Sequence, residues 1–176
     1  MKKVFEIVKK VVSFVFFAIY FVFALIMTIL LLNFNDYGVT QFDSTSFILV
    51  NDKISNDKYA KGDLVLVKSL KIEDYKEGDD LFTYKIGSDR IPTVQLGKIG
   101  TVYVEDDAIA FENGETYSSE FVAGVPTKKY ENIGSFLSIV ESKWGFLFIV
   151  LIPVFLIFIY EVYALIIEIK YGAHED

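Results

Sequence analysis

Two long apolar stretches constrain this chain more than any other feature. Residues 11–32, "VVSFVFFAIYFVFALIMTILLL", contain no charged side chain and would span about 33 Å as an α-helix, enough to cross a bilayer. Residues 144–167, "WGFLFIVLIPVFLIFIYEVYALII", form a second stretch that only Pro153 and Glu161 interrupt. The mean hydropathy of +0.41 is high for a soluble chain of 176 residues. The sequence therefore predicts two transmembrane helices.

The first stretch also resembles a secretory signal sequence, with a basic start and an apolar core. The apolar core of a signal sequence is shorter, about 7–15 residues, and precedes a cleavage site made of small residues. The text after Leu32 is "NFNDYG", which has no such site. An uncleaved anchor is the interpretation that the residues favour.

The positive-inside rule gives the orientation of the two predicted helices. Four lysines precede the first stretch, at positions 2, 3, 9 and 10, so residues 1–10 are expected in the cytoplasm. Residues 33–143 are then extracytoplasmic, and residues 168–176 form a cytoplasmic tail. Glu161 falls near the cytoplasmic end of the second helix, where a carboxylate can reach the interface. The localisation predicted is a multi-pass protein of the cell membrane.

Charge and composition exclude several functions for the segment 33–143. This segment is acidic, in a chain whose net charge is −7, and it has no basic stripe, so nucleic acid is not an expected partner. The chain has no cysteine, and its single histidine, His174, lies in the predicted tail. We therefore expect no disulfide, no metal site, no cofactor and no histidine base in the outer segment.

Short apolar or alternating runs bounded by turn residues recur between the two membrane stretches. This pattern is typical of strands, and no helical periodicity persists there. The expected strands are 46–50, 63–70, 80–86, 93–106 and 108–111. The fold class predicted is an all-β extracytoplasmic domain flanked by two transmembrane α-helices. Residues 130–145 have spaced apolar residues that fit either an amphipathic approach to the membrane surface or a packed connector.

Taken in order, four pieces of the sequence resemble the signal peptidase I family, in the branch with a C-terminal membrane helix. The pieces are "YAKGDLVLVK", "YKEGDDLFTYK", "LGKIGTVYVEDDAIAFENGE" and "IGSFLSIVESKWGFLFIVLIPVFLIFIYE". The resemblance implies an all-β module on the outer membrane face that cleaves signal peptides from exported precursors. It also implies a serine nucleophile in a Ser-Gly-Ser-Met-x-Pro box, with a lysine or histidine base on a later strand.

The serine position of that family does not match this chain cleanly. Counting back from Asp63 to the family's serine gives Ile54 in "NDKISND", and Ser55 lies one residue later. Ser55 would be the nucleophile only if the loop were one residue shorter; otherwise it is an ordinary turn serine. Ser46 is rejected because it lies too far before Asp63 and belongs to the strand predicted at 46–50.

The base position departs from the family pattern in the same way. The best match, "LGKIGTV", puts Gly97 at the base and Lys98 beside it, and a slip of one residue would turn the side chains to the opposite face of a strand. A second match, "SDRI" at 88–91, puts Asp89 at the base. Glu115 in "FENGET" takes the place of a later aspartate. The catalytic residues expected in an active enzyme are therefore Ser55, Lys98 and Glu115.

Three functions remain open on the sequence. The first is a catalytically degenerate signal peptidase-like protein that binds exported precursors or signal peptides at a sheet edge without cutting them. The second is an active signal peptidase I, a serine endopeptidase, that uses Ser55 and Lys98. The third is a structural membrane subunit that joins other envelope proteins. The lipid bilayer is a partner in all three.

Overall fold

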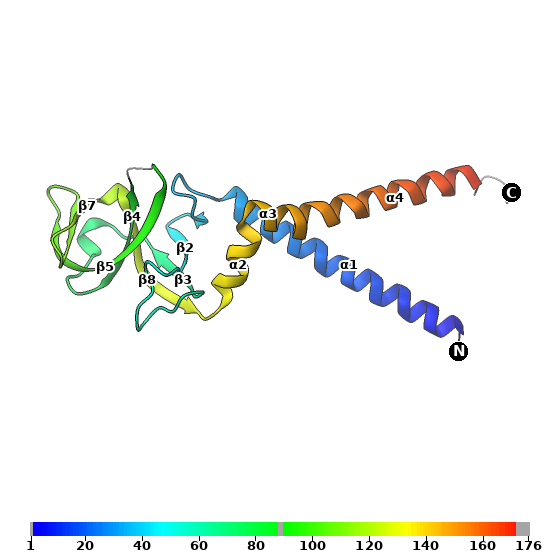
Figure 1. Ribbon diagram of the computed structural model, residues 1–176, viewed down its shortest axis with the longest axis horizontal. Coiled ribbons are helices and arrows are strands. Elements are labelled where there is room, and N and C mark those ends of the chain that lie inside the picture. The colour runs from blue at the N-terminus through cyan, green and yellow to red at the C-terminus, as the bar shows by residue number, and fades with distance from the viewer. Residues whose placement is uncertain (1, 88–89, 172–176) are drawn as a thin grey trace. The chain divides into compact units, whose positions relative to one another are not determined.

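The computed structural model describes residues 2–87 and 90–171 (Figure 1). Ser88 and Asp89, and with them the alternative base position at Asp89, lie outside the described residues. Two compact units make up the chain. One contains Met1–Ile29 and Ile139–Asp176, and the other contains Leu30–Ser138.

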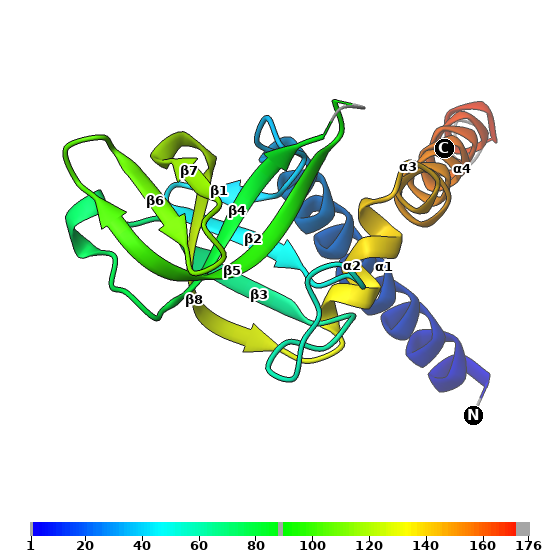
Figure 2. The same cartoon turned by 60° about the vertical axis from the view of Figure 1, so that its left-hand side comes forward.

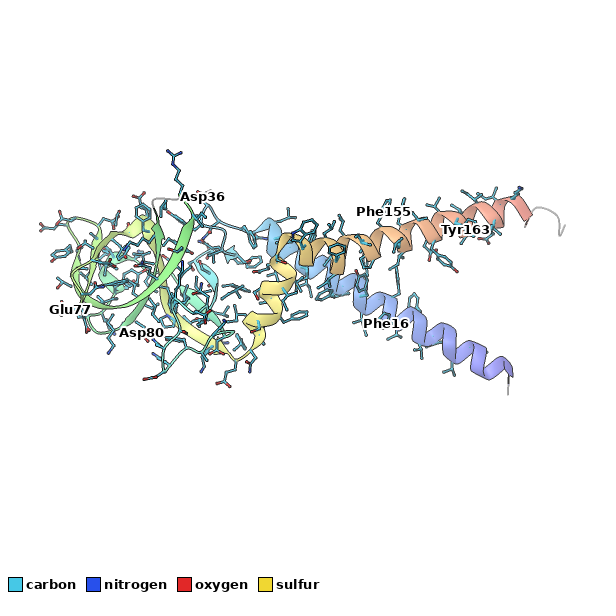
Figure 3. The ribbon with its side chains drawn as sticks, viewed as in Figure 1. Phe16, Asp36, Glu77, Asp80, Phe155 and Tyr163 are labelled. Atoms are coloured by element: carbon cyan, nitrogen blue, oxygen red, sulfur yellow. The ribbon has the colours of Figure 1, made fainter. Side chains whose placement is uncertain are left out.

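The first unit consists of helices. Its elements are α1 (Lys2–Leu32), α3 (Lys143–Gly145), the π-helical turn η3 (Phe146–Leu151) and α4 (Ile152–Tyr171). Two stretches, Phe14–Leu32 and Phe146–Lys170, are long and apolar enough to cross a membrane. Large apolar side chains such as those of Phe16, Phe155 and Tyr163 project from these helices and are exposed (Figure 3). Apolar side chains exposed in this number are suited to lipid rather than to water.

A hydrogen bond joins the two long helices where the second one is irregular. In an α-helix the N–H of residue 153 would donate to the carbonyl of Ile149, but Pro153 has no N–H. The Tyr20 hydroxyl of α1 lies 2.7 Å from the Ile149 carbonyl oxygen and 3.1 Å from that of Val150. Tyr20 therefore supplies the donor that Pro153 cannot, beside the π-helical turn.

The second unit is built on one antiparallel sheet of eight strands in the order β1-β2-β3-β8-β4-β5-β6-β7, which curves strongly (Figure 2). The strands are β1 (Gln41–Phe42), β2 (Thr45–Leu49), β3 (Leu64–Lys68), β4 (Asp80–Ile86), β5 (Pro92–Tyr103), β6 (Ala108–Phe111), β7 (Thr116–Ser118) and β8 (Val122–Tyr130). Two short 3₁₀ turns, η1 (Ile72–Asp74) and η2 (Ser119–Phe121), connect them. One helix, α2 (Ile133–Glu141), follows β8.

The domain is mostly β, as the sequence predicts, and the five expected strands are found at β2 to β6, with the expected ends at β4 and β6 and with ends shifted by a few residues at β2, β3 and β5. β1, β7 and β8 were not among the expected strands. β8 is the important one because it pairs with both β3 and β4 and so joins the two halves of the sheet.

Two separate apolar clusters hold the sheet together, one on each face of the β4–β5 pair. Because cross-strand partners share a face, Phe82 and Leu96 point one way and Leu81 and Gly97 the other. The first cluster includes Ile48, Ile54, Tyr59, Val65, Val67, Phe82 and Tyr84. The second includes Tyr75, Leu81, Ile99, Ile109, Phe111, Tyr117 and Val122.

Candidate functional site

Ser55 lies in the loop 50–63 between β2 and β3, and its surroundings are those of a loop residue. The loop is closed at its base by paired main-chain hydrogen bonds between Val50 and the Gly62–Asp63 turn, each 2.9 Å. Within it the side-chain oxygen of Asn56 accepts hydrogen bonds from the N–H groups of Lys58 and Tyr59. Ser55 itself is exposed, and its hydroxyl donates to the Asp52 carbonyl at 3.3 Å.

The residue at the family's serine position, Ile54, is part of the apolar core. Its side chain is buried in the first cluster together with Tyr59 from the same loop. A nucleophile must be reachable by substrate, so the side chain at this position has a packing role. Ser55 follows directly and lies on the solvent side of the loop.

The residue at the family's base position, Gly97, faces a filled space. A Cβ atom added to Gly97 would lie 2.5 Å from the Phe111 ring, closer than any ordinary contact between carbon atoms. The Phe111 ring is buried and packs against Tyr117, with 5.0 Å between ring centroids. The volume that a lysine or histidine base would need is therefore taken by Phe111.

Lys98 points to the opposite face of the β4–β5 pair, where it lies across from Asp80. That face is also the side of the loop 50–63, because Tyr59 of the loop packs edge-on against Phe82, with 5.6 Å between ring centroids. Lys98 is exposed, and among the described residues its side chain has no ion pair. Ser55 and Lys98 thus share one face of the sheet, but no hydrogen bond joins them in the described part of the chain.

Asp80, across from Lys98 on that face, has two polar partners (labelled in Figure 3). Its Oδ2 atom accepts from the Lys58 amine at 2.6 Å and from the Tyr59 hydroxyl at 3.1 Å. The hydrogen bond to Asp80 raises the pKa of Lys58, and burial raises the pKa of Tyr59. Both groups therefore hold their protons at neutral pH, and neither is poised as a base.

Glu115, the third predicted residue, lies on the other face. Its carboxylate pairs with the Lys85 amine at 2.8 Å and lies 2.9 Å from the Tyr117 hydroxyl. The hydrogen bond from Lys85, followed by that from Tyr117, lowers the pKa of Glu115. Lys85 shares its face with Leu81 and Gly97, so Glu115 is on the side of the sheet away from Lys98. The structure does not bring Glu115 together with Ser55 or Lys98.

One edge of β5 carries main-chain groups that no strand in the described part of the chain uses. Ile99 bonds to the main chain of Gly78 and Asp79, and the antiparallel alternation then turns the N–H and C=O groups of Val94 and Leu96 away from β4. β6 pairs with β5 only from Ile99 onward. Among the described residues no strand pairs with β5 on this side before Lys98. No local sequence pattern predicts this edge, because it depends on where β6 begins to pair with β5.

The side chains beside this free edge are apolar and partly exposed. Val94 and Leu96 pack on the first cluster, and Tyr37 and Val39 pack on the same cluster from the segment that follows α1. The Tyr37 ring stacks on Tyr84, with 4.1 Å between ring centroids. The free edge of β5 therefore runs along an apolar floor, which is the geometry that an added strand needs.

Comparisons of the chain with descriptions of protein families, with curated proteins and with solved structures find no significant match.

Proposed function

We propose that this chain is a membrane-anchored, signal peptidase I-like protein that binds an extended segment of an exported precursor and does not cut it. The free edge of β5 at Val94 and Leu96 carries this proposal. A client peptide would add a strand there, with main-chain hydrogen bonds giving affinity and the apolar floor receiving alternate side chains. Exported precursors supply apolar, extended segments of this kind.

Two positions at which the chain departs from the family pattern support the absence of cleavage. Ile54 is buried where the family has its nucleophile, and Phe111 fills the space over Gly97 where the family has its base. A serine hydroxyl without a base in hydrogen-bond reach is a poor nucleophile. The Ser55 hydroxyl donates instead to a main-chain carbonyl.

The proposed orientation has both ends of the chain in the cytoplasm and residues 33–143 outside. It rests on the four lysines before the first span. Protease added to intact cells should cut within 33–143 and leave both ends whole. Protection of the middle segment together with cleavage of the ends would reverse the orientation.

The binding proposal is tested with the full-length protein in lipid nanodiscs and a fluorescent peptide that carries a standard signal sequence. Val94→Pro removes the N–H at the free edge without touching the β4 ladder, and Val94→Ala is the matched control that keeps it. We expect Val94→Pro to weaken binding about three- to tenfold beyond Val94→Ala, the worth of one main-chain hydrogen bond. Equal affinities of the two variants would remove β5 as the binding edge.

A second candidate function, an active peptidase, is favoured by one observation, that Lys98 lies on the face of the Ser55 loop. It is tested by offering the purified protein a whole precursor beside the variants Ser55→Ala and Lys98→Ala. Cleavage by the wild type that both variants abolish would replace the non-cleaving proposal with a Ser55–Lys98 dyad. If neither cleavage nor binding occurs, the structural membrane subunit is the remaining function.

A further inference from the structure

α2 carries apolar side chains on more of its circumference than is buried. Gly134, Leu137 and Val140 are buried, Ser135 and Ser138 are exposed, and three large apolar residues are also exposed over about half of their surface. These three, which we call the α2 stripe, are Ile133, Phe136 and Ile139. They are spaced three residues apart, so they lie on one side of the helix. Phe136 is 52% exposed and Ile139 is 57% exposed.

The buried side of α2 is fixed tightly to the β domain. The N–H of Ser135 donates to the Gly62 carbonyl at 3.0 Å. A Cβ atom at Gly134 would collide with the Asp63 carbonyl, so only glycine allows this approach. The carboxylate of Asp63 in turn accepts from the N–H groups of Ala60 and Asn132. α2 is therefore attached to the same Gly62–Asp63 turn that closes the loop 50–63.

The C-terminal end of α2 is followed within a few residues by the second apolar span. A single residue, Ser142, separates Glu141 at the end of α2 from Lys143 at the start of α3, and the span Phe146–Lys170 follows. One residue bridges only about 3.5 Å, so the end of α2 must lie at the surface of any bilayer that this span crosses. Trp144, which is 70% exposed, stands at the point where aromatic residues gather at the membrane interface.

We infer that the α2 stripe is inserted in the headgroup region of the leaflet next to the β domain. The occupant of this apolar face is lipid, because the chain itself holds the helix at the bilayer surface and because the serine side faces the other way. Insertion to about 5–10 Å is typical of such helices. This inference rests on the membrane span and does not depend on peptide binding.

The absence of cysteine allows a clean test by single labels. Phe136→Cys and Ile133→Cys report on the α2 stripe, and Ser138→Cys is the matched control on the serine side of the same helix. Phe155→Cys, an exposed position on α4, is the reference for a lipid contact. Each full-length variant is labelled with an environment-sensitive fluorophore in nanodiscs of phosphatidylcholine and phosphatidylglycerol. Spin-labelled lipid and aqueous iodide are the two quenchers.

We expect spin-labelled lipid to reduce the fluorescence at positions 133 and 136 about twofold and iodide to leave it nearly unchanged, with the reverse at position 138. Quenching of positions 133 and 136 by iodide, as strong as at 138, would place the stripe in water and overturn the inference. Protection of both stripe positions from both quenchers would also overturn it, because a protein surface, such as a second copy, would then cover the stripe.

Discussion

Gly97 and Lys98 are neighbours on β5, yet they meet opposite environments. Gly97 faces the second apolar cluster, where the buried Phe111 ring occupies the space in front of it. Lys98 faces the loop 50–63 and the carboxylate of Asp80, and its side chain is exposed. The difference shows that two neighbouring positions of one strand can differ completely in the room they offer a side chain. At Gly97 the space for a base is filled, whereas at Lys98 the side chain is available but Ser55 is not bonded to it.

The largest effect on stability is expected from removing the Phe111 ring, which fills the space in front of Gly97. Phe111→Ala should lower the free energy of unfolding by about 3–5 kcal/mol, because it removes a buried aromatic ring and leaves a cavity over Gly97. The measurement is urea unfolding of the full-length protein in detergent, followed by near-ultraviolet circular dichroism. The matched control is Tyr103→Ala, an exposed aromatic residue on β5, which should change stability by less than about 0.5 kcal/mol. Equal losses of unfolding free energy in the two variants would show that the Phe111 ring is no more important to stability than an exposed aromatic residue.

The next effect compares the two neighbours directly. Gly97→Val should cost about 1–3 kcal/mol because its side chain overlaps the Phe111 ring, while Lys98→Val on the exposed face should change stability by less than about 0.5 kcal/mol. Phe111→Leu combined with Gly97→Val should recover part of the loss, because the smaller side chain vacates the overlap. A cost for Gly97→Val no greater than for Lys98→Val would show that the position can accept a side chain after all.

The strands that form this contrast could be predicted from the sequence, but the contrast itself could not. Alternating apolar residues and turn signals predict β4 at 80–86 with the observed ends. The contact between Gly97 and Phe111 depends on how β6 folds back over β5, and no local pattern encodes it. The resemblance to the signal peptidase I family draws attention to Gly97, and only the structure shows what fills the space in front of it.

β8 was missed for a physical reason. Its sequence, "VAGVPTKKY", contains a glycine and a proline, which normally interrupt strands. Gly124 has a φ of +132° beside the main chain of Lys68, and Pro126 lies opposite Val67 at a β-bulge, so both residues serve the strand's irregular pairing. The position of Ser55 in a loop, in contrast, can be predicted from the turn residues around it. It agrees with the interpretation of Ser55 as a turn serine.

A smaller effect distinguishes the two lysines near Asp80. Lys58→Ala should lower stability by less than about 1 kcal/mol, because it removes an ion pair whose lysine is largely exposed and keeps the hydrogen bond from the Tyr59 hydroxyl to Asp80. Lys98→Ala should cost less still. The measurement is the free energy of unfolding of each variant at low and at high salt. The difference between the two variants should be smaller at high salt, because salt screens the ion pair. A larger loss in Lys98→Ala would show that Lys98, and not Lys58, neutralises Asp80.

The smallest effect is a pH dependence of stability that comes from Glu115, which lies on the same face of the β4–β5 pair as Gly97. Lys85 and Tyr117 hold the pKa of Glu115 below its ordinary value of 4.5, so ionised Glu115 favours the folded state. A lowered folded-state pKa gives a contribution that is complete above the unfolded pKa and is lost as the pH falls through the folded value. Glu115→Gln should therefore be less stable than the wild type at pH 7, and the two should converge as the pH falls below 4.5.

Urea midpoints of the two proteins from neutral to acid pH measure this convergence, with Glu112→Gln as the control because Glu112 has no ion pair among the described residues. The Lys85 partner does not confuse the result. Its pKa is raised by the hydrogen bond to Glu115, so the amine stays protonated at every pH in the scan and Glu115 is the partner of this ion pair that titrates there. A difference between wild type and Glu115→Gln that stayed constant down to acid pH would mean that shape, rather than charge, holds Glu115 against Tyr117. Packing, rather than the ion pair with Lys85, would then account for what Glu115 contributes to stability.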